Sequence, residues 1–173
     1  LDLLSIPLTI FWVISFTNVV NLIDGLDGLA AGVSAIASVT VILVSVQMGY
    51  YHVAVMTAAL AGGIVGFIRY NFNPATIFMG DTGSMFLGGM VVALSFGIGR
   101  PVLLILAGCL YFIEAISVML QVGYYKLTKK RLFKMAPLHH HFELCGFSEQ
   151  KIVLLFSAIS FVGCLIAILL VRK

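Results

Sequence analysis

The stretch Ile152–Val171 reads IVLLFSAISFVGCLIAILLV, and it decides the fold class. It contains no charged residue over a length that suffices to cross a bilayer, because a membrane-spanning helix needs about 20 predominantly apolar residues. Five apolar runs of similar length precede it, with bounds at Leu4–Val20, Ala30–Gln47, His52–Ile68, Gly83–Gly99 and Pro101–Tyr125. The sequence therefore predicts an all-α, polytopic membrane bundle of about six helices, in one transmembrane domain over residues 1–173.

The composition excludes several other classes of protein. Hydrophobic residues make up 61% of the chain and charged residues 10%, whereas a soluble domain is about 25% charged. A soluble globule and a disordered chain are both excluded. A net charge of +3 is too small for a nucleic-acid-binding face, and the three cysteines predict no disulfide framework. The chain opens on Leu1 without a basic leader, so we expect a piece of a longer protein.

The polar connections are predicted to share one side of the membrane. Residues 21–28, 69–82 and 126–151 each follow an odd-numbered apolar run, so they emerge on the same face. That face carries seven basic residues: Arg69, Lys126, Lys129, Lys130, Arg131, Lys134 and Lys151. The opposite face carries Arg100, Arg172 and Lys173. The positive-inside rule therefore predicts cytoplasmic polar loops in a multi-pass protein.

The first polar loop repeats an Asp-Gly unit. Asp24 and Asp27 are three residues apart, and each precedes a glycine that lets the backbone turn tightly or approach a ligand. Such a pair suits a hydrated magnesium ion, or hydrogen bonds from a base or a sugar. A structural alternative is that Asp27 caps the second helix while Asn21 closes the first.

The second polar loop ends in Phe78-Met79-Gly80-Asp81-Thr82-Gly83-Ser84, directly before an apolar run. Backbone N–H groups, two hydroxyls and a carboxylate thus gather at a helix N-terminus, which is anion-binding geometry beside a metal ligand. The structural alternative is an ordinary cap by Asp81 or Thr82, with Gly83 in the first turn.

The third polar loop joins a basic run, Lys126–Met135, to three histidines. The basic run suits lipid phosphates at the membrane interface, or reflects topology alone. In an extended segment His139 and His141 would share a face while His140 points away. Zinc binding stays open as an alternative, although the spacing is not that of a structural zinc site. Phosphate binding, proton positioning and a solvated loop also stay open. Glu114, inside the fifth run, is interpreted as a buried hydrogen-bonding group between helices.

Three motifs together resemble one family. NLIDGLDGLA at Asn21–Ala30, NPA with FMGDTGS within Asn73–Ser84, and APLHHHFE at Ala136–Glu143 are similar to the polyprenyl-phosphate N-acetylhexosamine-1-phosphate transferases, and most closely to their muramoyl-pentapeptide branch. The resemblance implies transfer of phospho-N-acetylmuramoyl-pentapeptide from UDP-N-acetylmuramoyl-pentapeptide to undecaprenyl phosphate in the bacterial inner membrane. The products would be lipid I and UMP, with Mg²⁺ as cofactor. It also implies the C-terminal part of the enzyme, because nothing before Asn18 matches the family's aspartate-rich motif.

The resemblance also implies residue roles. Asp81 would bind magnesium, and the catalytic residues would be Asp81, Asp24 and His139. Substrate would be bound by Asn21, Asp24, Asp27, Asn71, Phe78, Gly80, Ser84, Gln121, His139, His140 and His141. The implied partners are the nucleotide substrate, undecaprenyl phosphate and membrane lipid, without nucleic acid, and a homodimer is a candidate assembly.

Two alternatives stay open. An N-acetylglucosamine-1-phosphate transferase would share the Asp-Gly and Gly-Asp-Thr-Gly-Ser features, but the Ala136–Glu143 motif favours the muramoyl branch. A secondary transporter would place its binding groups at the bilayer midplane. Here the acids and histidines cluster in loops, and only Glu114 lies deep in an apolar run.

Overall fold

The structure, a computed structural model, describes residues 2–171 and consists of eight helices over that range. The bounds are α1 Asp2–Ile23, α2 Leu29–Gln47, α3 Tyr51–Asn71, α4 Gly80–Gly97, α5 Leu103–Ala107, α6 Cys109–Thr128, α7 Leu138–Leu144 and α8 Glu149–Val171. No strand forms within the described range, which confirms the predicted all-α class. Arg172 and Lys173, counted in the charge asymmetry, lie outside the described residues.

Four helices are long and apolar enough to cross a membrane by themselves: α1 from Leu3, α2, α3 and α8. The predicted polytopic bundle is therefore confirmed. The other two predicted spans, Gly83–Gly99 and Pro101–Tyr125, are not among these four helices. Helix α4 begins at Gly80, so its first turns are polar. The fifth predicted span, Pro101–Tyr125, was wrong as one continuous helix, because the chain breaks at Gly108 between α5 and α6.

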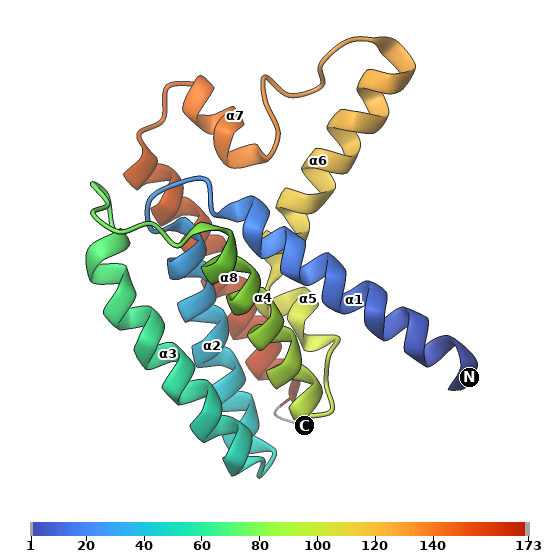
Figure 1. Ribbon diagram of the computed structural model, residues 1–173, viewed down its shortest axis with the longest axis vertical. Helices are drawn as coiled ribbons and strands as arrows, with labels where there is room; N and C mark the ends of the chain where they lie inside the picture. Colours follow the sequence, from blue (N-terminus) through green and yellow to red (C-terminus); the bar gives the residue numbers. More distant parts are fainter. Residues whose placement is uncertain (1, 172–173) are drawn as a thin grey trace.

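Gly108, where the helix breaks, is closely packed. A Cβ atom at this position would lie 2.7 Å from the Tyr111 ring and 2.8 Å from the Leu104 carbonyl oxygen, so only glycine fits. Helix α8 packs tightly against the same region, where a Cβ on Gly163 would lie 2.4 Å from the Leu106 carbonyl oxygen. Beyond the break, α6 diverges from the other helices and its C-terminal half projects from the bundle (Figure 1).

Helix α2 forms the centre of the bundle, packed between α3 and α8 (Figure 1). It is rich in Ala and Ser, and such small residues let membrane helices approach closely. Helices α1 and α4 make a second close pair, since a Cβ on Gly88 would lie 2.8 Å from the Thr17 Cα atom. Many large apolar side chains face outward, including Phe11, which is 67% exposed, as a lipid-facing surface requires.

The three polar loops lie at the same end of the bundle, as the count of crossings predicts (Figure 1). The short α2–α3 and α4–α5 turns lie at the other end. Because the loops after α1, α3 and α6 meet there, residues far apart in the sequence can form one site.

Candidate active site

The first contact between loops joins the end of α1 to the start of α4. The Asn21 amide nitrogen donates to Asp81 Oδ1 at 3.0 Å and to Ser84 Oγ at 2.9 Å. Asp81 lies in the first turn of α4, whose N-cap residue, Met79, makes no side-chain cap hydrogen bond. The alternative that Asp81 or Thr82 is merely a helix cap was therefore wrong, and Asp81 instead presents its carboxylate to another loop.

Asp24 lies in the turn after α1, close to the start of α4. Burial raises the pKa of Asp24 from 3.8 to about 6, the Gly80 backbone N–H lowers it, and the negative charge of Asp81 raises it. Asp24 and Asp81 therefore act on each other electrostatically. Two carboxylates in such proximity favour a cation between them, or a proton on one of them.

Asp27 ties the first two polar loops together. It accepts a hydrogen bond from the Ala75 backbone N–H at 2.9 Å and faces the Asn73 amide at 3.4 Å. Asn73 also donates to Glu149 at the start of α8, at 2.7 Å. Helix α2 instead follows Gly28, which has φ 80° and no side-chain cap in the described structure, so the alternative that Asp27 caps this helix was wrong.

Asn71 is buried and braces the same two loops. Its side-chain oxygen accepts the Gly28 backbone N–H at 3.2 Å, and its nitrogen donates to the Ile77 carbonyl at 3.1 Å. Both functional groups of this amide are thus engaged within the protein. The predicted contact between Asn71 and substrate stays a prediction, and its observed contacts are those of a positioning residue.

The three histidines lie in a short helix, α7, so the extended conformation assumed for them was wrong. Pro137 precedes this helix, and its fixed φ suits a helix start. Successive residues of a helix point about 100° apart, so each ring meets a different partner. His139 Nδ1 lies 3.2 Å from Glu114, and His140 Nδ1 lies 2.5 Å from Glu143. His141 Nδ1 accepts the Lys134 backbone N–H at 3.1 Å.

Two of these rings rest on the first polar loop. A Cβ built on Gly25 would lie 2.6 Å from His139 Nε2 and 3.2 Å from His140 Nε2. The third loop therefore closes over the Asp-Gly repeat, above the turn that carries Asp24. Across the residues that the structure describes, no three His, Cys, Asp or Glu side chains group as a metal site, which gives the zinc alternative no support.

The remaining predicted site residues lie around this centre. Ser84 is buried in the first turns of α4, and Gly80 opens that helix with φ 64°. Phe78 is 73% exposed beside it. Gln121, on α6, braces the basic loop instead, because its side-chain oxygen accepts the Leu132 and Phe133 N–H groups at 3.1 and 2.8 Å.

Sequence reasoning missed Gly25, Asn73 and Glu149 as parts of this assembly. For Gly25 the only signal was its place in the Asp-Gly repeat. The prediction that Glu114 forms a buried hydrogen bond to a neighbouring helix is confirmed, and that helix is α7.

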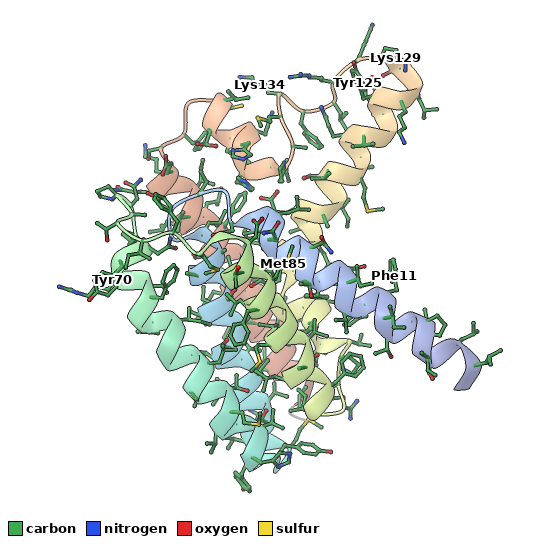
Figure 2. The ribbon with its side chains drawn as sticks, in the orientation of Figure 1. Phe11, Tyr70, Met85, Tyr125, Lys129 and Lys134 are labelled. Carbon is green, nitrogen blue, oxygen red and sulfur yellow. The ribbon has the colours of Figure 1, made fainter. Side chains whose placement is uncertain are left out.

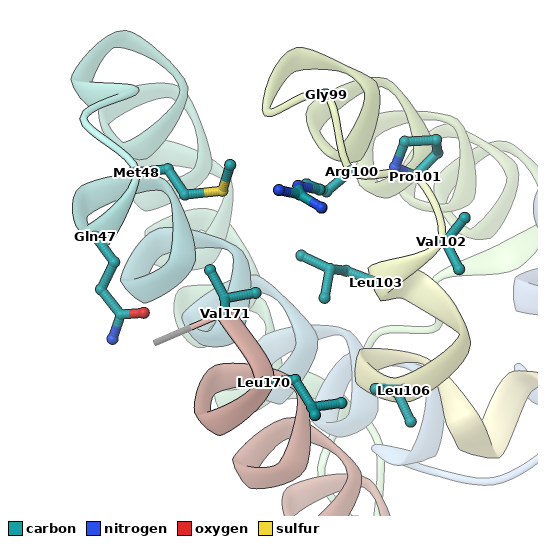
Figure 3. Close-up of a pocket in the computed structure, with 10 residues that line it drawn as sticks. All are labelled: Gln47, Met48, Gly99, Arg100, Pro101, Val102, Leu103, Leu106, Leu170 and Val171. Atoms are coloured by element: carbon teal, nitrogen blue, oxygen red, sulfur yellow. The ribbon is translucent and has the colours of Figure 1, made fainter. Parts of the chain in front are cut away.

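Two cavities flank the ends of the bundle. One, of about 650 Å³, lies between α6 and the basic loop, and its lining includes Gln121, Lys126, Lys129, Arg131 and Lys134. Figure 2 shows Tyr125, Lys129 and Lys134 around this projecting region. A larger one, of about 1150 Å³, lies at the opposite end, where Arg100 points between Met48 and Leu103 (Figure 3). Its described lining has no carboxylate or histidine, so it is not the candidate active site.

Comparison with known proteins identifies the family. The model described as glycosyl transferase family 4 matches residues 1–99, more than half of the chain. Three relatives named phospho-N-acetylmuramoyl-pentapeptide-transferase come from Clostridioides difficile, Clostridium novyi and Caldicellulosiruptor bescii. They are 49%, 47% and 47% identical over 98%, 100% and 96% of this chain. The alignments cover 53%, 53% and 52% of these relatives, so the chain spans about half their length. The chain belongs to glycosyl transferase family 4.

Proposed function

We propose that this protein transfers phospho-N-acetylmuramoyl-pentapeptide from its uridine diphosphate carrier to undecaprenyl phosphate, forming lipid I and UMP. The observation that supports this reaction best is the meeting of Asn21, Asp81 and Ser84 beside Asp24, below the His139–His140 pair. The names of the relatives support the same reaction. Phosphoryl transfer needs positioning and charge neutralisation more than a strong nucleophilic side chain, and this site offers both.

The donor set fits Mg²⁺. Magnesium takes oxygen ligands and is usually bound through one or two carboxylates together with substrate phosphates, rather than by an all-protein cage. Asp81 and Asp24 are two such carboxylates, close enough that the charge of one raises the pKa of the other. When bound there, the ion would neutralise negative charge on the diphosphate. Asn21 would orient Asp81 for this role through its 3.0 Å hydrogen bond.

Other groups of the protein would bind the two substrates. The Gly80 N–H at the start of α4 is directed to Asp24. The other backbone N–H groups of the first turn have no partner within that helix, so they would suit an anionic substrate. The side chain of His140 is 28% exposed and pairs with Glu143, which suits it to contact a phosphate oxygen. The basic residues around the α6 cavity suit the phosphate of a lipid acceptor.

The membrane context of the reaction is part of the proposal. An acceptor with a long polyprenyl chain resides in the bilayer, which explains why polar loops are built on membrane-spanning helices. The basic bias of these loops supports a position on the cytoplasmic side of the inner membrane, where a water-soluble nucleotide substrate would be available.

The test is an assay on the protein purified in detergent from its native membrane. UDP-N-acetylmuramoyl-pentapeptide and UDP-N-acetylglucosamine are each supplied with undecaprenyl phosphate and Mg²⁺, and UMP and lipid-linked product are measured. We expect UMP and product with the muramoyl substrate. Product with UDP-N-acetylglucosamine alone would instead assign the other branch of the family. Flux of a substrate across proteoliposomes without UMP formation would favour a transporter.

A further inference from the structure

Glu114 lies inside α6 with its side chain fully buried. Its carboxylate accepts the Leu138 backbone N–H at 2.5 Å and the His139 backbone N–H at 3.1 Å. These are the first two residues of α7, so a residue 24 positions earlier in the chain caps this helix from outside. The N-cap residue of α7, Pro137, makes no side-chain cap hydrogen bond itself, so this role falls to Glu114.

The same carboxylate also holds the His139 ring. Oxygen Oε1 of Glu114 lies 3.2 Å from His139 Nδ1, and both side chains are 0% exposed. A carboxylate acceptor at Nδ1 selects the form of the imidazole that carries its hydrogen there. The opposite nitrogen, Nε2, is buried without a hydrogen-bond partner among the described residues. It faces Gly25, where a Cβ atom would lie only 2.6 Å away.

We propose that Glu114 is a positioning residue of the active site. It fixes α7 and the His139 ring, the ring packs against Gly25, and Gly25 sets the place of Asp24 relative to Asp81. This inference rests on the proposed function, because it assigns Glu114 to the site of that reaction. It also reassigns His139, since a fully buried ring has no free face for substrate.

The energetics favour this role over simple packing. A carboxylate inside a membrane helix is expensive to bury, and three donors on one side chain compensate that cost. An apolar residue would avoid the cost entirely if α6 only had to pack against α7. The contacts of Glu114 therefore explain why α6 carries a carboxylate here: it fixes the first turn of α7 and the orientation of the His139 imidazole.

The first test needs no substrate. Hydrogen exchange of the segment 136–144 is measured in wild type, Glu114→Gln and Glu114→Ala, with Ser117→Ala as control. Ser117 is a buried polar residue on the same helix, and among the described residues its hydroxyl donates to the Glu114 backbone carbonyl alone, at 2.6 Å. We expect the Leu138 and His139 amides to exchange about 10- to 100-fold faster in Glu114→Ala, because hydrogen bonds to a charged acceptor are lost. Unchanged exchange would overturn the proposal.

The second test reads the imidazole directly. In protein with ¹⁵N-labelled histidine, we expect the His139 signal to show a hydrogen on Nδ1 in wild type and in Ser117→Ala, and to change in both Glu114 variants. An unaltered His139 signal would contradict the proposed link. If Glu114→Ala fails to accumulate, Glu114→Gln, which has nearly the same volume, provides both readouts.

The third test asks whether the Glu114–His139 contact matters for catalysis. We expect kcat of Glu114→Gln to fall about 10²-fold, as for a displacement of about 1 Å at a reacting centre, with a smaller loss of thermal stability than in Glu114→Ala. The double variant Gly25→Ala with Glu114→Gln should have a kcat no lower than that of the less active single variant, because both changes act through His139. Wild-type kcat in Glu114→Gln would overturn the positioning role. Absence of transfer by wild type would refute the proposed function, whereas the exchange and histidine readouts would still judge the Glu114–His139 link.

Discussion

Gly25→Ala should damage the site through one added methyl group. The new Cβ would lie 2.6 Å from His139 Nε2, whereas ordinary contacts begin at 3.4 Å, so the ring would have to move by about 0.8 Å. The ring cannot move freely, because His139 is fully buried and bonded to Glu114. Gly25 is not among the positive-φ glycines, so alanine is compatible with the local backbone and the cost is steric.

Overpacking of this kind costs about 1–3 kcal/mol. If the strain is relieved by displacing the Asp24 turn, the rate of transfer should fall by about 5- to 150-fold, since each 1.36 kcal/mol is tenfold. The matched control is Gly62→Ala on α3, where a Cβ would have no atom within 4 Å. Thermal unfolding and UMP release are measured for both variants. Wild-type stability and turnover in Gly25→Ala would refute the contact between the first and third loops.

Other changes test other parts of the site. Asp81→Asn keeps an oxygen for the bond from Asn21 but loses the charge, so UMP release across a magnesium titration should fall by about 10²–10³-fold with the fold intact. The native state holds the Asp24 proton more tightly than the unfolded chain, with a pKa of about 6 against 3.8. In metal-free buffer the free energy of unfolding should therefore decrease as pH rises from about 4 to about 6, and Asp24→Asn should abolish that decrease in thermal melts. Binding to vesicles of anionic lipid should weaken by about 1 kcal/mol per charge when three basic residues become Gln, namely Lys129, Lys130 and Arg131. Ser148→Cys should react with an impermeant thiol reagent only from the cytoplasmic side, and labelling from outside in sealed cells would contradict the predicted topology.

The helical scaffold could be predicted because apolar run length and loop position are local properties of the sequence. The number of membrane crossings before each polar loop was enough to predict that all three lie at one end of the bundle. The break at Gly108 could not be predicted, because many glycines occur in these helices and only the contacts with Tyr111 and α8 make this one decisive. The helical state of His139–His141 was also hidden, since it depends on capping by Glu114 from a distant helix.

Four carboxylates at the polar end of the bundle differ in how fully the protein itself satisfies their charge, and this division could not be read from residue type. Glu114 and Asp27 accept backbone N–H groups from distant loops, so their charges are already used to hold the protein together. Asp81 accepts only a side-chain amide in the described contacts, and it is exposed. Asp24 accepts one backbone N–H, from Gly80, but it is half-buried, and burial and the charge of Asp81 together oppose its ionisation. A bound cation would relieve that opposition, because it stabilises both ionised carboxylates at once. The electrostatic demand for a cation is therefore concentrated on Asp24 and Asp81, at the place where α4 begins and the two histidines close over the Asp-Gly repeat.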